Sequence, residues 1–317
     1  MFKNLFSLVA VASFLSLMPF TAMAEGTNET SAKIEDVNGQ KNVVPGDDID
    51  ETITNKKMRA ETGSKSKYSF SSQLNYIGGS IDKPFAADRP NIAGMTGTTD
   101  AALLGGQLSG KYNISSSKSL LAGVGVRWIS PLQGSSVPSG YTGKKVDADN
   151  PYLIYQYLYK WAGVQSAMQI SPTFYTDSNL VNDGYVTTLA ISQNNIYEIG
   201  HSGLSLGLYL LAQTGYYNKN TPQAEANQSD FTINVDPFIE YQLTDKANIR
   251  TVTNLWNYEH ARNLAANTYI FDKVYQSVGL GYALTRDIFL YPNIQFLPDD
   301  IRADRTNLAL NTIINLF

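Results

Sequence analysis

From Tyr68 to the end of the chain, apolar and polar residues alternate with a period of two. In residues 231–243 every odd position is apolar, Tyr or Pro, whereas all but one of the even positions are polar. Residues 204–216 and 288–296 show the same alternation. Because successive side chains of a strand point to opposite faces, each segment predicts a β-strand with one apolar and one polar face.

About twelve such segments follow one another, and most are long enough for a tilted membrane strand of about 9–11 residues. They cover residues 68–79, 101–114, 118–130, 151–161, 164–175, 184–198, 204–217, 229–243, 247–257, 270–285, 287–297 and 305–317. Short connections, such as 115–117, alternate with long ones, such as 131–150. An even number of strands places both termini on one side of the membrane, which we expect to be the periplasmic side.

Residues 1–24 have the features of a secretory signal peptide. Lys3 is followed by an apolar stretch over 5–20, and Ala22 and Ala24 supply the small residues of a cleavage site. Ser13 and Ser16 interrupt the apolar stretch, which makes it a poor membrane helix. We therefore expect an exported protein whose mature form begins at Glu25.

Residues 25–67 are polar and charged, with few apolar residues, and cannot form a core. We interpret them as a disordered periplasmic segment. A weak helical period near residues 50–59 leaves open an alternative, a short plug that enters the barrel lumen. The barrel itself is expected over residues 68–317.

The export signal, the alternating segments and the terminal strand from Arg305 to Phe317 resemble Gram-negative bacterial outer-membrane β-barrels of the porin-like kind. The resemblance implies an all-β, antiparallel, up-and-down transmembrane barrel of about 12 strands. It also implies outer-membrane lipid and lipopolysaccharide as neighbours, and a barrel-assembly machinery that recognises the strand ending at Phe317. Asn315 departs from the pattern, because the family usually has an apolar or aromatic residue there.

The composition excludes several other classes. The chain has no cysteine, hence no disulfide framework, lipoprotein cleavage site or thiolate metal site. Its net charge of −4 gives no basic surface for nucleic acid. Acidic loop residues match no calcium-binding spacing, and we interpret them as solvated charge; they are Asp147, Asp149, Asp299, Asp300 and Asp304. We expect no cofactor and no metal, and we interpret Arg89, Arg302 and Arg305 as possible contacts to lipopolysaccharide phosphate.

Alternation assigns seven charged residues to the lumen, because an Arg or Lys facing lipid at the bilayer midplane would cost about 2–4 kcal/mol. These pore-lining candidates are Lys111, Arg127, Lys160, Asp236, Glu240, Arg250 and Lys273. Glu240 and Arg250 lie symmetrically about a short turn and predict a cross-strand ion pair.

Two interpretations of the remaining basic residues stay open. Lys111, Arg127 and Lys160 come from consecutive strands and could form a basic stripe that favours anionic solutes. Alternatively, they pair with the N-terminal segment or Asp236 in a packed lumen. Inward glycines likewise either leave a channel open or let a plug approach the wall; they are residues 105, 123, 125, 207, 279 and 281.

The leading functional hypothesis is a porin-like channel for passive diffusion of small polar or anionic solutes. A second is a structural or surface-recognition barrel that acts through long loops at 80–100 and 131–150. A third is an outer-membrane hydrolase centred on His260 with Glu259 or Asp272. Nothing in the spacing assigns a catalytic residue.

Overall fold

The computed structural model describes residues 49–94, 99–135, 143–219, 228–262 and 270–316. All of them belong to one compact unit, Asn42–Phe317. Within these residues no helix is both long enough and apolar enough to cross a bilayer. The predicted signal peptide, residues 25–48 and Phe317 lie outside the described residues.

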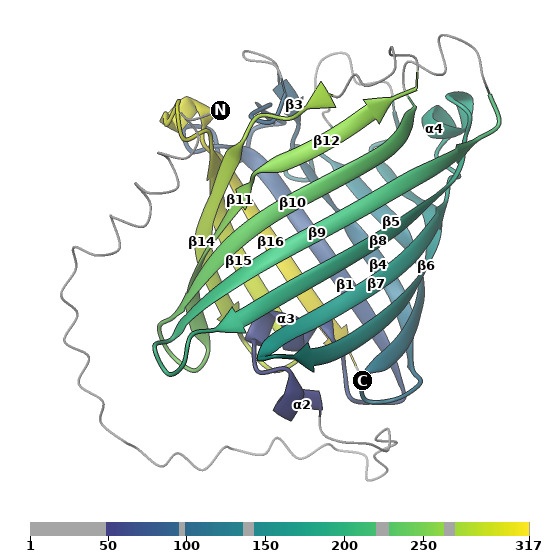
Figure 1. Cartoon of the computed structure of the whole chain (residues 1–317). Coiled ribbons are helices and arrows are strands. Elements are labelled where there is room, and N and C mark those ends of the chain that lie inside the picture. Colours follow the sequence, from purple (N-terminus) through teal and green to yellow (C-terminus); the bar gives the residue numbers. More distant parts are fainter. Residues whose placement is uncertain (1–48, 95–98, 136–142, 220–227, 263–269, 317) are drawn as a thin grey trace. The chain divides into compact units, whose positions relative to one another are not determined.

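The fold is a closed, all-β antiparallel barrel of twelve strands, as the alternation predicted (Figure 1). The wall strands are β1 (Tyr68–Ser80), β4 (Leu103–Asn113), β5 (Lys118–Ile129), β6 (Val146–Trp161), β7 (Val164–Phe174), β8 (Tyr185–Glu198), β9 (Leu204–Tyr217), β10 (Ser229–Gln242), β11 (Ala247–Asn254) with β12 (Trp256–Ala261), β13 (Ile270–Phe271) with β14 (Tyr275–Ala283), β15 (Ile288–Phe296) and β16 (Asn307–Leu316). β11 and β12 are two parts of one wall strand, as are β13 and β14. The barrel closes where β1 pairs with β16 on one side and β4 on the other.

The two ends of the barrel differ. Short turns join the strands at one end, called here the short-turn end, where the described part of β16 also finishes. The other, long-loop end carries the small hairpin of β2 (Asp88–Pro90) and β3 (Thr99–Ala101), the helix α4 (Ser178–Asn182) and the 3₁₀ turn η2 (Ala303–Arg305).

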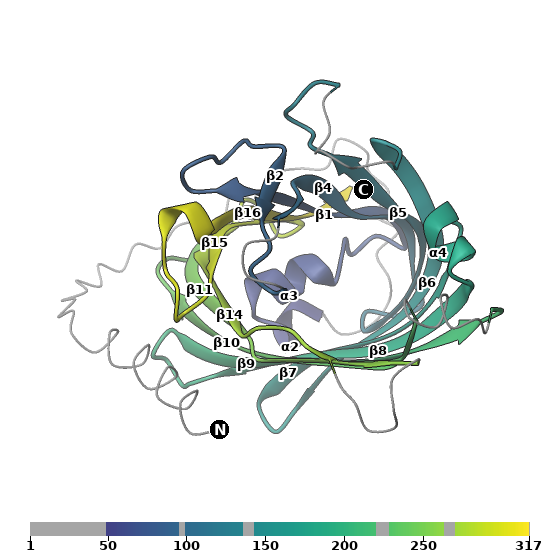
Figure 2. The same cartoon turned by 90° about the horizontal axis from the view of Figure 1, so that it is seen from above.

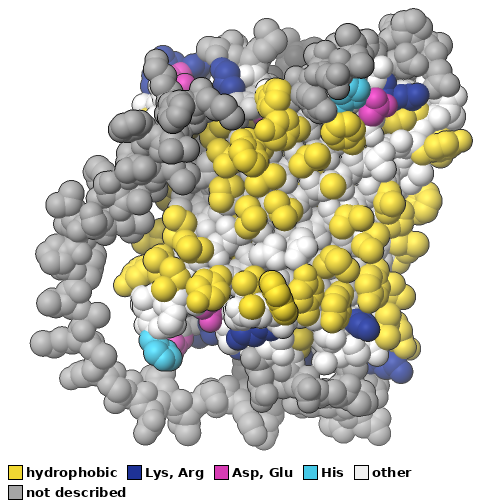
Figure 3. Space-filling view, viewed as in Figure 1, with side chains coloured by type: hydrophobic (Ala, Val, Ile, Leu, Met, Phe, Trp, Pro, Cys, Tyr) yellow, Lys and Arg dark blue, Asp and Glu magenta, His cyan; other side chains and the backbone are white. Residues whose placement is uncertain are grey.

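The wall has the opposite polarity to that of a water-soluble protein. On β5, Ser119 is 3% exposed and its neighbour Leu120 is 47% exposed, and the same inversion recurs around the barrel. Figure 3 shows the result on one face, where apolar side chains cover the middle of the wall and charged groups gather near its ends. An apolar exterior around polar inward residues is the arrangement that a bilayer requires of a barrel.

Membrane barrels carry girdles of aromatic residues at both interfaces, and aromatic residues at the strand ends follow this arrangement in part. Trp128, Trp161 and Trp256 are all exposed. Tyr152 is different, because it is buried and packs with Leu121 on the inner face of the wall. It belongs to the inward row of β6, and Gly123 on β5 leaves room for its hydroxyl.

Inward glycines make space for neighbouring side chains. A Cβ at Gly207 would lie 2.0 Å from ring atoms of Phe238, the cross-strand neighbour on β10. A Cβ at Gly281 would lie 2.0 Å from Oδ1 of Asn248. At these two positions a neighbouring side chain therefore fills the space that the glycine leaves.

Residues 49–67, called here the plug, form two short helices at the short-turn end of the barrel, and the second of them lies inside the ring of strands (Figure 1 and Figure 2). α2 covers Ile49–Thr52 and α3 covers Lys56–Glu61. For this stretch the structure favours the plug alternative over the disordered-segment interpretation. The reason is that the barrel wall supplies the apolar and polar partners that the segment lacks by itself.

Replacing Gly207 by Ala should lower the stability of the barrel by about 1–3 kcal/mol, because a methyl group there overlaps the Phe238 ring. The measurement is the urea midpoint of the refolded barrel. Gly110→Ala is the matched control, since nothing lies within 4 Å of a Cβ at Gly110. Equal midpoints for the two variants would contradict this account of Gly207.

Candidate functional site in the barrel lumen

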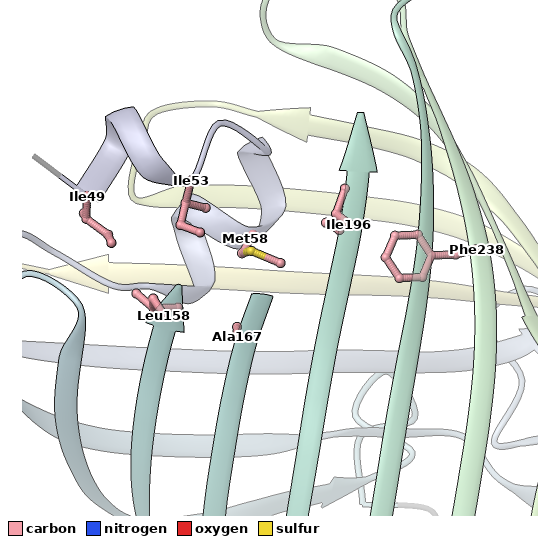
Figure 4. Packing of buried hydrophobic residues seen from close by; sticks show 7 residues of the cluster. All are labelled: Ile49, Ile53, Met58, Leu158, Ala167, Ile196 and Phe238. Atoms are coloured by element: carbon pink, nitrogen blue, oxygen red, sulfur yellow. The ribbon is translucent and has the colours of Figure 1, made fainter. Parts of the chain in front are cut away.

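An apolar contact anchors the plug to the inner wall. Ile53 and Met58 are both 0% exposed and pack with Ile49 against inward residues of four strands (Figure 4). These wall residues are Leu158 on β6, Ala167 on β7, Ile196 on β8 and Phe238 on β10. Phe238 is the one apolar residue among the even positions of 231–243, so the plug explains that interruption.

A second apolar contact joins the plug to the opposite part of the wall. Ala60 is 1% exposed and packs with Ala283, Phe289, Tyr291 and Ile313, which lie on β14, β15 and β16. The two clusters place apolar side chains on both sides of α3, so the helix is held across the lumen.

Barrel side chains bind the backbone at the start of α3. Oε1 of Gln165 accepts hydrogen bonds from the N–H groups of Thr54 and Asn55, at 2.8 and 3.0 Å. Asn55 is the N-cap: its Oδ1 accepts from the Met58 N–H at 3.0 Å, and its Nδ2 donates to Glu240 at 2.5 Å. Three amide groups that helix formation leaves without an intrahelical partner are thereby satisfied.

The end of α3 is bound in the same way, now through carbonyl oxygens. Four successive carbonyls, those of residues 60–63, each accept a hydrogen bond from the barrel. The donors are Asn315 at 2.8 Å, Gln156 at 3.3 Å, Lys111, and Arg286 at 2.6 Å. The last carbonyls of a helix need such partners, and here three strands and one turn supply them.

Gly63 ends the helix in a left-handed conformation, with φ +76°. Glycine adopts this conformation without the steric cost that a Cβ imposes. A Cβ at this position would also lie 2.9 Å from Nζ of Lys111. Gly63 therefore lets the chain turn toward β1 while the ammonium group of Lys111 reaches the Thr62 carbonyl.

An ion-pair network holds the plug at the short-turn end. Arg286, in the turn before β15, contacts Asp50 at 2.9 Å and the side chain of its neighbour Asp287 at 2.7 Å. Lys65 also pairs with Asp50, at 3.0 Å. Burial alone would raise the pKa of Asp50, but Arg286, with Lys65, outweighs it and holds that pKa below its ordinary value of 3.8.

Among the predicted lumen charges, Glu240 and Arg250 form the expected cross-strand ion pair. Both are almost fully buried, and the Arg250 guanidinium lies 3.9 Å from the Phe238 ring centroid. Glu240 is also the acceptor for Asn55, so this pair is part of the wall that receives the plug.

The structure does not bring Lys111, Arg127 and Lys160 together. Lys111 lies at the short-turn end and donates to the plug. Arg127 lies at the long-loop end and pairs with Asp177 at 2.8 Å and Asp149 at 3.5 Å. Lys160 is exposed near the turn between β6 and β7. Their part in selectivity stays a prediction.

The remaining two candidates occupy different surroundings. Asp236 lies on the inner face of β10, opposite Tyr209 of β9, and its Oδ1 is shielded. Lys273 was expected on a strand, but it lies between β13 and β14 and is exposed. The cause is a break in the wall strand at residues 272–274, where the ladder to β11 has not yet begun.

The other chemistry candidates lie at the long-loop end. His260 stacks on Phe231, and its Nδ1 lies 2.9 Å from Asp230. Carboxylates of Asp147, Asp149 and Asp177 come within 4.8 Å of one another, but the Arg127 guanidinium lies among them. In the η2 segment Arg302 pairs with Asp304 at 2.7 Å and Arg305 pairs with Asp300.

Sequence reasoning missed the polar residues that bind the plug. They are Asn113, Gln156, Gln165, Arg286 and Asn315. Two signals were present: Phe238 interrupts a polar face, and Asn315 occupies a position that is usually apolar. Both are explained by contact with residues 53–60.

A closed antiparallel sheet with an apolar exterior and a polar lumen defines a transmembrane β-barrel, and the wall of this chain has that arrangement. No protein-family model and no curated protein matches its sequence. Solved structures resemble it at a distance. A NanC porin is 10% identical with a TM-score of 0.45, over 78% of this chain and 100% of that one.

Two further solved structures are similar. An outer-membrane channel from Pseudomonas putida F1 is 8% identical with a TM-score of 0.46, over 81% of this chain and 98% of that one. A KdgM porin, solved with a disordered oligogalacturonate, is 10% identical with a TM-score of 0.41, over 78% and 98%. The class assignment rests on this chain's own strand pairing and polarity.

Acidification should loosen the plug. The lowered pKa of Asp50 means that its ion pairs stabilise the docked plug fully above about pH 3.8 and less as the pH falls below that value. A fluorophore on Lys56→Cys, unique because the chain has no cysteine, should become more accessible to iodide between pH 5 and about pH 3.

Asp50→Asn in the same labelled chain is the control for this titration. Without the carboxylate, the label should be more accessible at neutral pH and should lose most of the change on acidification. An identical acid transition in both chains would show that Asp50 does not hold the plug.

Proposed function

We propose that the protein is an outer-membrane channel for passive diffusion of small polar solutes, and that the plug narrows its lumen. The observation that carries the proposal is the closed wall with polar side chains on its inner face and apolar ones outside. Such a wall separates a polar lumen from lipid along its whole length. Twelve strands enclose more space than barrels of about eight strands, which side chains alone fill.

The plug takes up part of that space at the short-turn end. It contacts β4, β6, β7, β8, β10, β15 and β16 through the residues described above, so it reaches most of the circumference there. Solutes then pass beside the plug, and the free cross-section at this level limits the conductance. The same contacts explain why the inner wall carries buried amide and charged side chains near the turns.

The orientation of the barrel in the membrane follows from the position of its short turns. We assign the short-turn end to the periplasm, because short turns lie on that side in outer-membrane barrels. Both the plug and the described end of β16 lie there. On this ground we propose that the plug and the end of the last described strand face the periplasm. A cleaved signal peptide before Glu25 and recognition of the last strand by assembly factors stay predictions from the sequence. Long loops then face lipopolysaccharide.

The test is single-channel recording in a planar bilayer. The mature chain from Glu25, refolded and checked by heat-shifted gel mobility, should give discrete current steps. Deleting residues 49–66 should raise the unit conductance severalfold, because the lumen widens at its narrowest level. Deleting the equally long stretch 25–42 should leave the conductance unchanged.

Met58→Asp provides a version of the test that keeps the chain length. A carboxylate cannot stay in the apolar contact with Leu158 and Ile196 without a large desolvation cost, so the plug should leave the wall and the conductance should rise. A folded barrel that passes no current in any of these forms would overturn the channel function.

A further inference from the structure

We infer that the long-loop half of the lumen favours cationic over anionic solutes. The inference rests on the proposed channel function and adds a substrate class to it. It differs from the anion preference expected of a basic stripe, because the structure gives the basic residues of that stripe other surroundings.

The basic groups are accounted for one by one. Lys111 is 4% exposed and donates to the Thr62 carbonyl, and Arg250 is 5% exposed and pairs with Glu240. Arg127 lies between two carboxylates, those of Asp177 and Asp149. The two carboxylates therefore carry more negative charge than the single positive charge of Arg127. Lys160, the third residue of the stripe, is exposed near the turn between β6 and β7, at the short-turn end. None of these four contributes a net positive field to the long-loop half of the lumen.

One wall of this half carries carboxylates on its inner face. Asp236 lies on the same face of β10 as Glu240, which binds Arg250 and the plug. Glu259 of β12 is paired with Thr232 of β10, again on the inward row. Asp272 accepts a hydrogen bond from Asn257, the residue opposite Asn234. The partners of Glu259 and Asp272 are the neutral groups Ser229 and Asn257, which leave the negative charge in place.

Two oxygens on this wall lack a donor among the described residues. They are Oδ1 of Asp236 and Oδ1 of Asn234, and both atoms are shielded from solvent by their neighbours. They stand on the same face of β10, two residues apart. Because no donor in the described part of the chain compensates Oδ1 of Asp236, the carboxylate adds to the negative potential at this level of the lumen.

Two basic residues stand near these carboxylates. Lys273 directly follows Asp272, is exposed, and interacts electrostatically with Asp300. Arg89, from the β2 segment, reaches inward and donates a hydrogen bond to Gln295 at 3.0 Å. Its guanidinium group also interacts electrostatically with Tyr275. Tyr275 is in turn within range of Asp236 and Asp272. The loop stretches outside the described residues, 95–98, 136–142, 220–227 and 263–269, contain no Lys or Arg. They therefore supply no further positive charge to the mouth.

A ring or wall of like charge in a narrow polar pore selects ions of the opposite sign, because low-dielectric walls focus its field. In the long-loop half, three carboxylates, those of Asp236, Glu259 and Asp272, outnumber two basic groups, and each of these has an acidic partner of its own: Arg89 interacts with Asp100 and Lys273 with Asp300. Arg127 and its two carboxylate partners, Asp149 and Asp177, together add a net negative charge. The sign of the field there is negative.

The experiment measures reversal potentials across a planar bilayer with a KCl gradient at pH 8, using the full mature barrel. We expect potassium to be more permeant than chloride by severalfold. The double variant Asp236→Asn with Asp272→Asn should bring the permeability ratio close to 1. Asp299→Asn, which removes the same charge from an exposed residue beyond β15, should leave the ratio unchanged.

The outcomes separate the inference from the channel function. Open channels that prefer chloride, or a potassium preference that survives the double variant, would overturn the inference and leave the channel function intact. An equal effect of Asp299→Asn would assign the selectivity to general surface charge and would also overturn it. A folded barrel without current would overturn both. Heat-shifted gel mobility confirms that each variant has folded.

Discussion

The structure depends on one constraint: backbone N–H and C=O groups that enter the lumen must find hydrogen-bond partners there. Two short helices of four and six residues cannot meet this need themselves, since their terminal groups without an intrahelical partner outnumber the internally bonded ones. The barrel meets it with Gln165 at the start of α3 and with Lys111 and Asn315 at its end. The inner wall is therefore specific for a helix in one position, and the apolar contacts of Ile53 and Met58 follow from it.

This constraint also changes the meaning of charge in the lumen. Counted along the sequence, basic residues outnumber acidic ones among the lumen candidates. Placed in three dimensions, Lys111 and Arg250 belong to the plug interface, whereas Asp236 does not. A channel's field is set by groups that are left without compensating neighbours, so selectivity follows from the pairing and not from the composition.

The twelve strands could be predicted from the sequence because lipid imposes a strict period of two, which each strand shows locally. The Glu240–Arg250 pair was predictable for the same reason, since a short turn sets its register. The plug contacts were not predictable, because they join residues more than 100 positions apart, as in Thr54 with Gln165. Phe238 and Asn315 broke the local rule, yet neither exception names its partner. Lys273 was misplaced because a strand break is invisible in the alternation.

The position of the plug in the chain has a consequence for how the barrel is closed. It directly precedes β1, and it also contacts β16 through Asn315, the strand that pairs with β1 to close the barrel. In the folded barrel the first and last strands are thus joined through one common segment, in addition to their own hydrogen bonds. Such a link raises the effective concentration of the two edges for each other. The plug is therefore part of the seam of the barrel: it links two strands that are separated by more than 200 residues in the sequence.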